Sequence, residues 1–202
     1  MRKKTVFGKI GVATMAAICS VCLLAGCANS GDRNSDEVQT ENVADPAGMV
    51  HLDSAEDVSA FFEEVYGGVA EDLLPWEVQT TELDLNDTQT VQYHTGLTDM
   101  TGIAGIYLSE SMMSSVAYSA VYIRTADEAD AEQIRQQLMD NIDPAKWICV
   151  TAEKQSSVIV GKDIFFVMGA QDTVDEVMNK AVAAAKSREM NTSEASEKIN
   201  PI

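Results

Sequence analysis

Apolar residues recur every three or four positions in three stretches of the chain, and this spacing predicts three helices. The first stripe comprises Val58, Phe61, Phe62, Val65 and Val69, the second Ala131, Ile134, Leu138 and Ile142, and the third Val174, Val177, Met178, Ala181, Val182 and Ala185. Residues with this spacing lie on one side of a helix, so each helix is expected to pack one face on a core. The residues that favour a helix start before each stripe are Asp53 or Ser54, Thr125 with Glu128, and Thr173 with Glu176.

Between the predicted helices, short runs rich in Val, Ile, Phe and Tyr indicate strands. Residues 102–110 and 114–124 predict a hairpin across a Ser- and Met-rich turn. Residues 147–151, 156–160 and 164–168 predict three more strands, with the last two joined across Gly161, Lys162 and Asp163. The short run from Val91 to Tyr93 is a further strand candidate.

The order of these elements, roughly α-β-β-α-β-β-β-α, predicts a single small α+β domain. Short connections join antiparallel strands, because a parallel pair needs a long crossover. We therefore expect a mostly antiparallel sheet with the helices packed on one face. The domain is expected to span residues 51–190, because the flanking segments 27–50 and 191–202 are polar and carry few large apolar side chains. Those segments predict a disordered acidic tether and a disordered tail.

Residues 1–26 have the pattern of a secretory signal peptide. Cationic residues at positions 2, 3, 4 and 9 precede an uncharged, mainly apolar stretch from Ile10 to Gly26. A basic start, an apolar middle and small residues before a break are the parts of such a peptide. The apolar stretch is shorter than the about 20 residues that a membrane-spanning helix needs.

The sequence Leu23-Leu24-Ala25-Gly26-Cys27 resembles the bacterial lipobox. The resemblance implies that the thiol of Cys27 receives a diacylglyceryl group and that a dedicated signal peptidase cuts between Gly26 and Cys27. It also implies attachment to the outer face of the cell membrane. Each buried CH₂ group contributes about 0.8 kcal/mol, so two acyl chains give stable anchoring. The alternative is an ordinary signal peptide whose cleavage site falls near a cysteine.

The charge of the chain limits its partners. The net charge is −18, and removal of the four cationic residues of segment 1–26 makes it −22 for the mature chain. Such an acidic protein is a poor ligand for nucleic acid or for anionic lipid head groups. Attachment to the membrane is therefore expected to depend on the lipid at Cys27 and not on a basic patch.

The cysteines predict a fold without disulfides. Cys19 and Cys22 lie in the leader and Cys27 is modified, so only Cys149 is expected to stay free. Cys149 follows Trp147 in an apolar run, which indicates a buried, inert thiol beside a core tryptophan.

The segment from Ser114 to Gly169 resembles a group of uncharacterised lipoproteins of Firmicutes, mostly clostridial, that form a domain of unknown function. The shared features are a strand that leads into an acidic helix, a Trp-bearing strand and a Gly-centred hairpin that ends in an apolar run. The likeness extends over about Gly102 to Ala185. It implies a small lipid-anchored extracytoplasmic domain and assigns no activity or site residue.

The sequence predicts no catalytic residue, no metal and no cofactor. It contains no His-Glu-x-x-His, no Gly-x-Ser-x-Gly and no phosphate-binding loop. His51 is expected at the end of the tether, and His94 with Asp99 would supply only two metal ligands, fewer than a zinc site needs. A serine site built from distant residues, with its nucleophile in the Ser-rich segment 109–115, stays open beside the simpler interpretation of a polar loop.

We therefore expect a lipid-anchored binding or accessory module that contacts a protein or peptide partner. Trp76 could form an exposed platform or pack a loop over the core, and Met112 with Met113 could form an adaptable loop tip. One alternative is a small-solute receptor of a transporter, although roughly 140 residues are few for two lobes around a cleft. The other alternative is a surface hydrolase.

Overall fold

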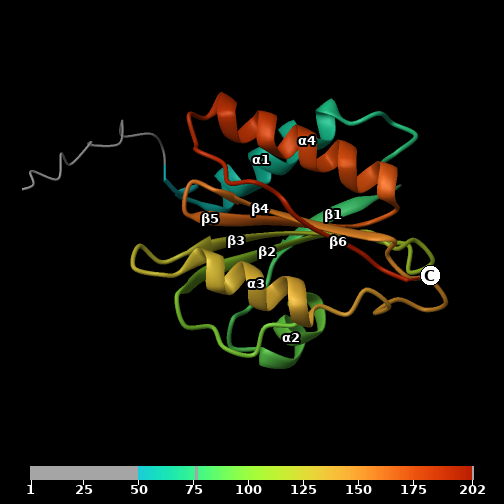
Figure 1. Ribbon diagram of the computed structural model, residues 1–202, viewed down its shortest axis with the longest axis horizontal. Helices are drawn as coiled ribbons and strands as arrows, with labels where there is room; N and C mark the ends of the chain where they lie inside the picture. The colour runs from blue at the N-terminus through green and yellow to red at the C-terminus, as the bar shows by residue number, and fades with distance from the viewer. Residues whose placement is uncertain (1–49, 76, 202) are drawn as a thin grey trace, which may run out of the picture. The chain divides into compact units, whose positions relative to one another are not determined.

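The computed structural model describes residues 50–75 and 77–201, which are built around one six-stranded sheet (Figure 1). All neighbouring strands are antiparallel, in the spatial order β1-β2-β3-β5-β4-β6. The strands are β1 (Val78–Glu82), β2 (Ile103–Ser111), β3 (Ser119–Thr125), β4 (Lys154–Val160), β5 (Asp163–Gly169) and β6 (Ser196–Ile199). The helices are α1 (Ala55–Gly68), α2 (Thr88–Thr95), α3 (Ala131–Asn141) and α4 (Gln171–Ser187). The expected α+β domain with an antiparallel sheet is confirmed.

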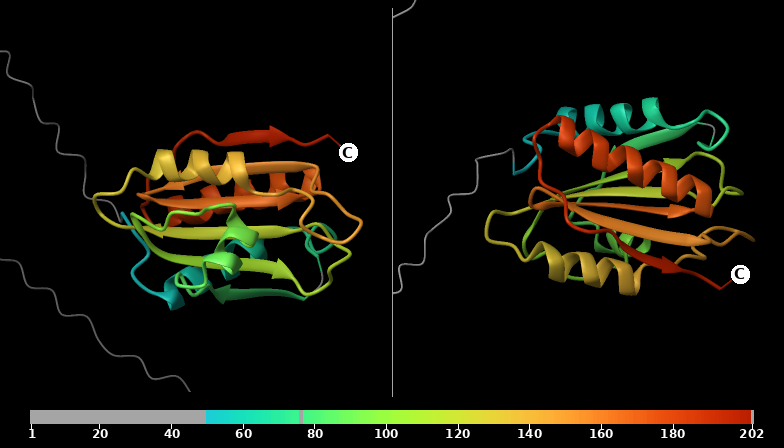
Figure 2. Two further views of the ribbon diagram at one scale, coloured as in Figure 1. Left: turned by 90° about the horizontal axis from the view of Figure 1, so that it is seen from below. Right: turned by 45° about the horizontal axis from the view of Figure 1, so that its top comes forward.

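The helices cover both faces of the sheet, so the prediction that they pack on one face is wrong. Helices α1 and α4 lie on one side, and α2 and α3 lie on the other (Figures 1 and 2). Large apolar side chains point to both sides of the central strands: Tyr122 and Phe165 join the core under α1 and α4, while Val121 and Phe166 join the core under α3. Continuously apolar strands of this kind are buried on both faces, and both faces therefore need a cover.

Helix α1 starts as the sequence predicts. The Ser54 hydroxyl accepts a hydrogen bond from the Asp57 N–H, and the Asp57 carboxylate accepts one from the Ser54 N–H. These reciprocal bonds satisfy two backbone donors at the helix start. The ring of Phe61 then packs edge-on against Tyr122 and Phe165, with ring centroids 5.4 and 5.8 Å apart.

The other two helices begin at residues that differ from the predicted ones. Thr125 is still the last residue of β3, and its hydroxyl donates to the Lys162 carbonyl, so Asp130 caps α3 instead. Helix α4 begins at Gln171, and the hydroxyl of Thr173 donates to the Leu73 carbonyl in the loop between α1 and β1. In both cases a tertiary contact engages the hydroxyl that local sequence assigns to a cap.

Two predicted strands are absent from the described residues. Val91 to Tyr93 lies inside α2, which Asp87 caps through the Thr90 N–H. Residues 147–151 form a loop, and Cys149 has a left-handed φ of 64° that a strand does not allow. The backbone of this loop is closed by a hydrogen bond from the Ala152 N–H to the Pro144 carbonyl.

The prediction of a disordered tail over 191–202 is wrong for the part of it that the structure describes. Residues Ser196–Ile199 form β6 and pair with β4, and the side-chain amide of Asn200 donates to the Ala152 carbonyl. The segment adds little apolar area to the core. It is held by backbone hydrogen bonds along a sheet edge, which any polar sequence can supply.

The two ends of the sheet carry different parts of the chain. At one end, which we call the entry end, the chain enters at Val50 beside the β4–β5 turn and the end of β3 (Figure 1). At the opposite end, which we call the far end, lie the β2–β3 loop (112–118) and the α3–β4 loop (142–153). Both loops project from this end of the sheet in the ribbon views (Figures 1 and 2).

Among residues 50–75 and 77–201, no helix is both long enough and apolar enough to cross a membrane. The predicted leader 1–26, the cleavage site at Gly26 and Cys27, the lipidation of Cys27 and all but the last residue of the tether 27–50 lie outside the described residues.

Candidate functional site

Exposed apolar side chains gather at the far end of the sheet. Six large apolar residues are exposed in the described part of the chain: Val50, Tyr93, Met112, Met113, Ile148 and Ile199. Val50 lies at the entry end, whereas the other five lie on or beside the two far-end loops and the end of β6. Ile148 is the most exposed of them, at 75 %. We call Met112, Met113 and Ile148 the far-end surface.

A buried lysine fixes the loop that carries Ile148. Only 1 % of the Lys146 side chain is exposed, and its ammonium group donates to the carboxylate of Glu110 and to the Ser119 hydroxyl, the latter at 3.2 Å. Glu110 and Ser119 face each other at the paired ends of β2 and β3. The ring of Trp147 lies 5.2 Å from the same ammonium group, which adds a cation–π contact. The α3–β4 loop is therefore tied to the rigid end of the sheet.

The charges of this cluster are set by burial and by one another. Burial alone would raise the pKa of Glu110, but the hydrogen bond with His94 and the charge of Lys146 outweigh it and lower this pKa to about 2. Burial lowers the pKa of Lys146, and the Glu110 carboxylate opposes that effect. Glu110 is consequently a carboxylate at any pH well above 2, and it holds the lysine in place.

The cluster resembles a serine–lysine catalytic pair only in composition. Ser119 is fully buried, so a substrate has no access to its hydroxyl. Burial lowers the pKa of Lys146 overall, although the Glu110 carboxylate opposes this, so the inaccessibility of Ser119 is what argues against a catalytic pair. The geometry therefore supports a structural role for this cluster and offers no nucleophile.

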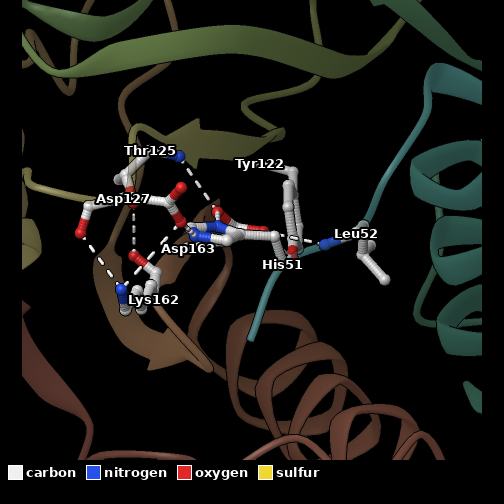
Figure 3. A network of polar contacts seen from close by, with 7 residues as sticks. All are labelled: His51, Leu52, Tyr122, Thr125, Asp127, Lys162 and Asp163. Atoms are coloured by element: carbon white, nitrogen blue, oxygen red, sulfur yellow. Dashed lines mark hydrogen bonds and ion pairs between the residues drawn. The ribbon is translucent and has the colours of Figure 1, made fainter. Parts of the chain in front are cut away.

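A second polar network holds the chain at the entry end (Figure 3). The carboxylate of Asp163 is fully buried and accepts hydrogen bonds from the Leu52 N–H at 3.1 Å, the Tyr122 hydroxyl at 3.0 Å and the Thr125 N–H at 2.9 Å. Its Oδ1 also lies 2.7 Å from Nδ1 of His51. A buried carboxylate needs such partners, because burying an unpaired charge is costly.

The same network clamps the backbone of the entering chain. The Lys162 N–H donates to the Val50 carbonyl at 2.7 Å, and Nε2 of His51 lies 3.2 Å from the exposed carboxylate of Asp127. Gly161 makes the close approach feasible: it has a φ of +63°, and a Cβ at this position would lie 2.3 Å from the Val50 oxygen. His51 is thus a structural partner at the start of the domain, where the sequence places it.

Comparison with known proteins does not identify a family for this chain. The chain matches no protein-family model, no curated protein and no solved structure. The resemblance to clostridial lipoproteins consequently stays a prediction from the sequence.

The residues singled out in the sequence are placed as follows. Cys149 is exposed, so the prediction of a buried thiol is wrong; its loop turns outward where a strand would have buried it. Trp147 is partly buried at the edge of the core under α3. His94 lies beside Glu110 while Asp99 accepts a hydrogen bond from the Thr101 N–H, so the two do not form a pair. Trp76 lies outside the described residues.

Within the described ranges, no three His, Cys, Asp or Glu side chains are grouped so as to hold a metal ion. Sequence reasoning missed Lys146, Glu110 and Ser119. They show no motif spacing: the pairing of β2 with β3 places Glu110 opposite Ser119, and the α3–β4 loop brings Lys146 to both.

Proposed function

We propose that this protein is a lipid-anchored extracytoplasmic binding module whose domain contacts a protein partner through the far-end surface. The observation that carries the proposal is that the junction with the predicted tether and most of the exposed apolar residues lie at opposite ends of the sheet. The chain that leads back to the predicted anchor at Cys27 joins the domain at the entry end, and five of the six large exposed apolar residues of the described chain lie on or beside the opposite end.

The clamp at the entry end supports this orientation. Asp163 ties His51 and Leu52 to the β4–β5 turn, so the junction between predicted tether and domain is fixed to the body of the sheet. A domain held at this end presents its far end to the surroundings of the membrane. The proposal therefore gives the entry-end network a positioning role.

The Lys146 cluster supports a role in binding. Exposed Ile and Met side chains on a mobile loop would lose conformational entropy on binding, and fixing the loop beforehand reduces that loss. Full burial of a side chain such as Ile148 contributes about 1.5–3 kcal/mol. A few such residues are enough for a hot spot at the centre of an interface.

The two alternatives fit the geometry less well. A solute receptor with two lobes around a cleft needs a second lobe, and residues 50–75 and 77–201 form one sheet domain. A serine hydrolase needs an accessible hydroxyl beside its base, and the serine that lies beside Lys146 is buried, so this cluster does not favour a hydrolase.

The exposed thiol of Cys149 allows a direct test, because it lies next to Ile148 and the chain's other three cysteines lie in the predicted leader and anchor. A photo-crosslinker attached to Cys149 on intact cells should capture a specific partner. The matched control carries Cys149→Ser and Glu128→Cys, which moves the probe to an exposed site at the entry end.

The proposal predicts capture from position 149, loss of that capture with Ile148→Asp, and no capture of the same protein from position 128. Equal capture from both positions, or capture that is unaffected by Ile148→Asp, would refute a far-end binding surface. Cys27→Ser tests the anchor separately: it should release the protein from the membrane, and retention there would contradict the predicted lipidation.

A further inference from the structure

Two of the three described lysines at the far end are held by the protein's own carboxylates, whereas Lys198 of β6 is exposed and donates to the Met139 carbonyl at 3.4 Å. Lys146 is bound by Glu110, and Lys154 lies 2.6 Å from a carboxylate oxygen of Asp175 and 2.9 Å from one of Glu197. The side chains of both lysines are at least nine-tenths buried, with 1 % and 8 % exposed. Neither lysine is therefore available to attract an anionic ligand.

Three carboxylates around the far-end surface, in contrast, are exposed to solvent. Glu77 adjoins Met112, since its carbonyl accepts the Met112 N–H at 3.1 Å. Asp72 lines a depression together with residues of the β2–β3 loop, and Asp143 stands at the start of the α3–β4 loop. All three are exposed, and none of them forms an ion pair within 4 Å with a described residue, although the charge of Asp143 also acts on the ammonium group of Lys146. The apolar residues thus have an acidic border.

We infer that the partner presents a cationic amphipathic segment, with apolar side chains against Met112, Met113 and Ile148 and with Lys or Arg side chains facing Asp72, Glu77 and Asp143. The inference rests on the proposed function and names the chemistry of its partner. Complementary charge around an apolar centre raises the association rate and excludes wrong partners. A second copy of this chain would bring two acidic borders together, and an anionic membrane would be repelled in the same way.

Two synthetic peptides of identical length test the inference. They share the same leucine positions, and the remaining positions are Lys in one and Glu in the other. An environment-sensitive dye on Cys149 of the full-length lipoprotein in detergent reports binding. The Lys peptide should bind and should weaken as the salt concentration rises, and the Glu peptide should bind at least tenfold more weakly.

Matched variants separate the far end from the general acidity of the chain. The double variant Glu77→Gln, Asp143→Asn should weaken binding of the Lys peptide by about twofold to thirtyfold, since each exposed ion pair contributes about 0.2–1 kcal/mol. Glu63→Gln combined with Glu128→Gln removes the same charge from exposed sites elsewhere and should change the affinity less than the far-end pair does.

Equal effects of the two double variants, or equal binding of the Lys and Glu peptides, would overturn the inference. Far-end dimerisation of the purified chain, or binding of the detergent-free protein lacking the Cys27 lipid to phosphatidylglycerol vesicles, would do the same. Failure of this inference can be distinguished from failure of the proposed function. If Cys149 captures a partner that depends on Ile148 but the crosslinked segment is neutral or acidic, only the cationic chemistry is wrong.

Discussion

Replacing Asp163 with asparagine should destabilise the domain strongly without changing its shape. The two carboxylate oxygens accept from buried donors on both sides: Oδ1 faces His51 and the Thr125 N–H, and Oδ2 faces the Leu52 N–H and the Tyr122 hydroxyl. The amide NH₂ of asparagine must take one of these positions, where a donor then faces donors. The Tyr122 hydroxyl can rotate and accept, but neither backbone N–H can.

The size of the effect follows from this count. One backbone N–H that is buried without a partner costs about 1–3 kcal/mol, and the remaining hydrogen bonds lose the contribution of the negative charge. We expect the free energy of unfolding to fall by about 2–4 kcal/mol, a large part of the about 5–15 kcal/mol typical of a domain. The melting temperature should fall by about 5–15 °C.

Urea unfolding followed by far-ultraviolet circular dichroism measures this loss, and hydrogen exchange of the Leu52 amide shows whether the entering chain is released. Asp127→Asn is the matched control, because Asp127 also contacts His51 but its side chain is 78 % exposed; it should cost less than about 1 kcal/mol. Equal losses in the two variants, or a loss below about 1 kcal/mol in Asp163→Asn, would refute the clamp.

Three further predictions concern single residues. The pKa of Glu110 in the folded chain is about 2, below its ordinary value of 4.5, so the stabilisation by this carboxylate is present above pH 4.5 and is lost as the pH falls toward 2. Glu110→Gln should therefore lower the free energy of unfolding by about 1–3 kcal/mol at pH 7 and flatten the acid limb of the curve of stability against pH. An unchanged acid limb would contradict this. Gly161→Ala should cost about 1–3 kcal/mol in urea unfolding, because the new Cβ meets the Val50 oxygen; a neutral result would show that the two chains are not packed as described. Cys149 in the native protein should react with a water-soluble disulfide reagent as fast as an unfolded control, and reaction only after denaturation would show a buried thiol.

Local patterns in the sequence predict the elements whose stability is local. The stripe of α1, its Ser54 start and the two hairpins β2–β3 and β4–β5 agree with the structure because capping and short turns act between near neighbours. The predicted starts of α3 and α4 fail for the opposite reason. Thr125 and Thr173 bind carbonyl groups that are distant in sequence, so Asp130 caps α3 instead and α4 starts after Ala170 without a side-chain cap.

The parts that the sequence does not predict depend on contacts between distant segments. The polar segment of β6 becomes ordered because β4 offers it an edge, and the α3–β4 loop takes its course because Lys146 is drawn to Glu110. Alternation of apolar residues cannot indicate either contact. The far-end surface was anticipated only through Met112 and Met113, while Ile148 was assigned to a strand that does not form.

Strand β6 also protects the protein against aggregation in concentrated solution. It covers the outer edge of β4 over Lys154 to Ser157, and β4 is otherwise enclosed by β5 and by helices on both faces. Cleavage ahead of Ser196 would uncover a row of backbone donors and acceptors on a strand that belongs to the interior of the protein. Such an open edge recruits strands from other molecules, so trimmed molecules should aggregate while the intact protein stays dispersed.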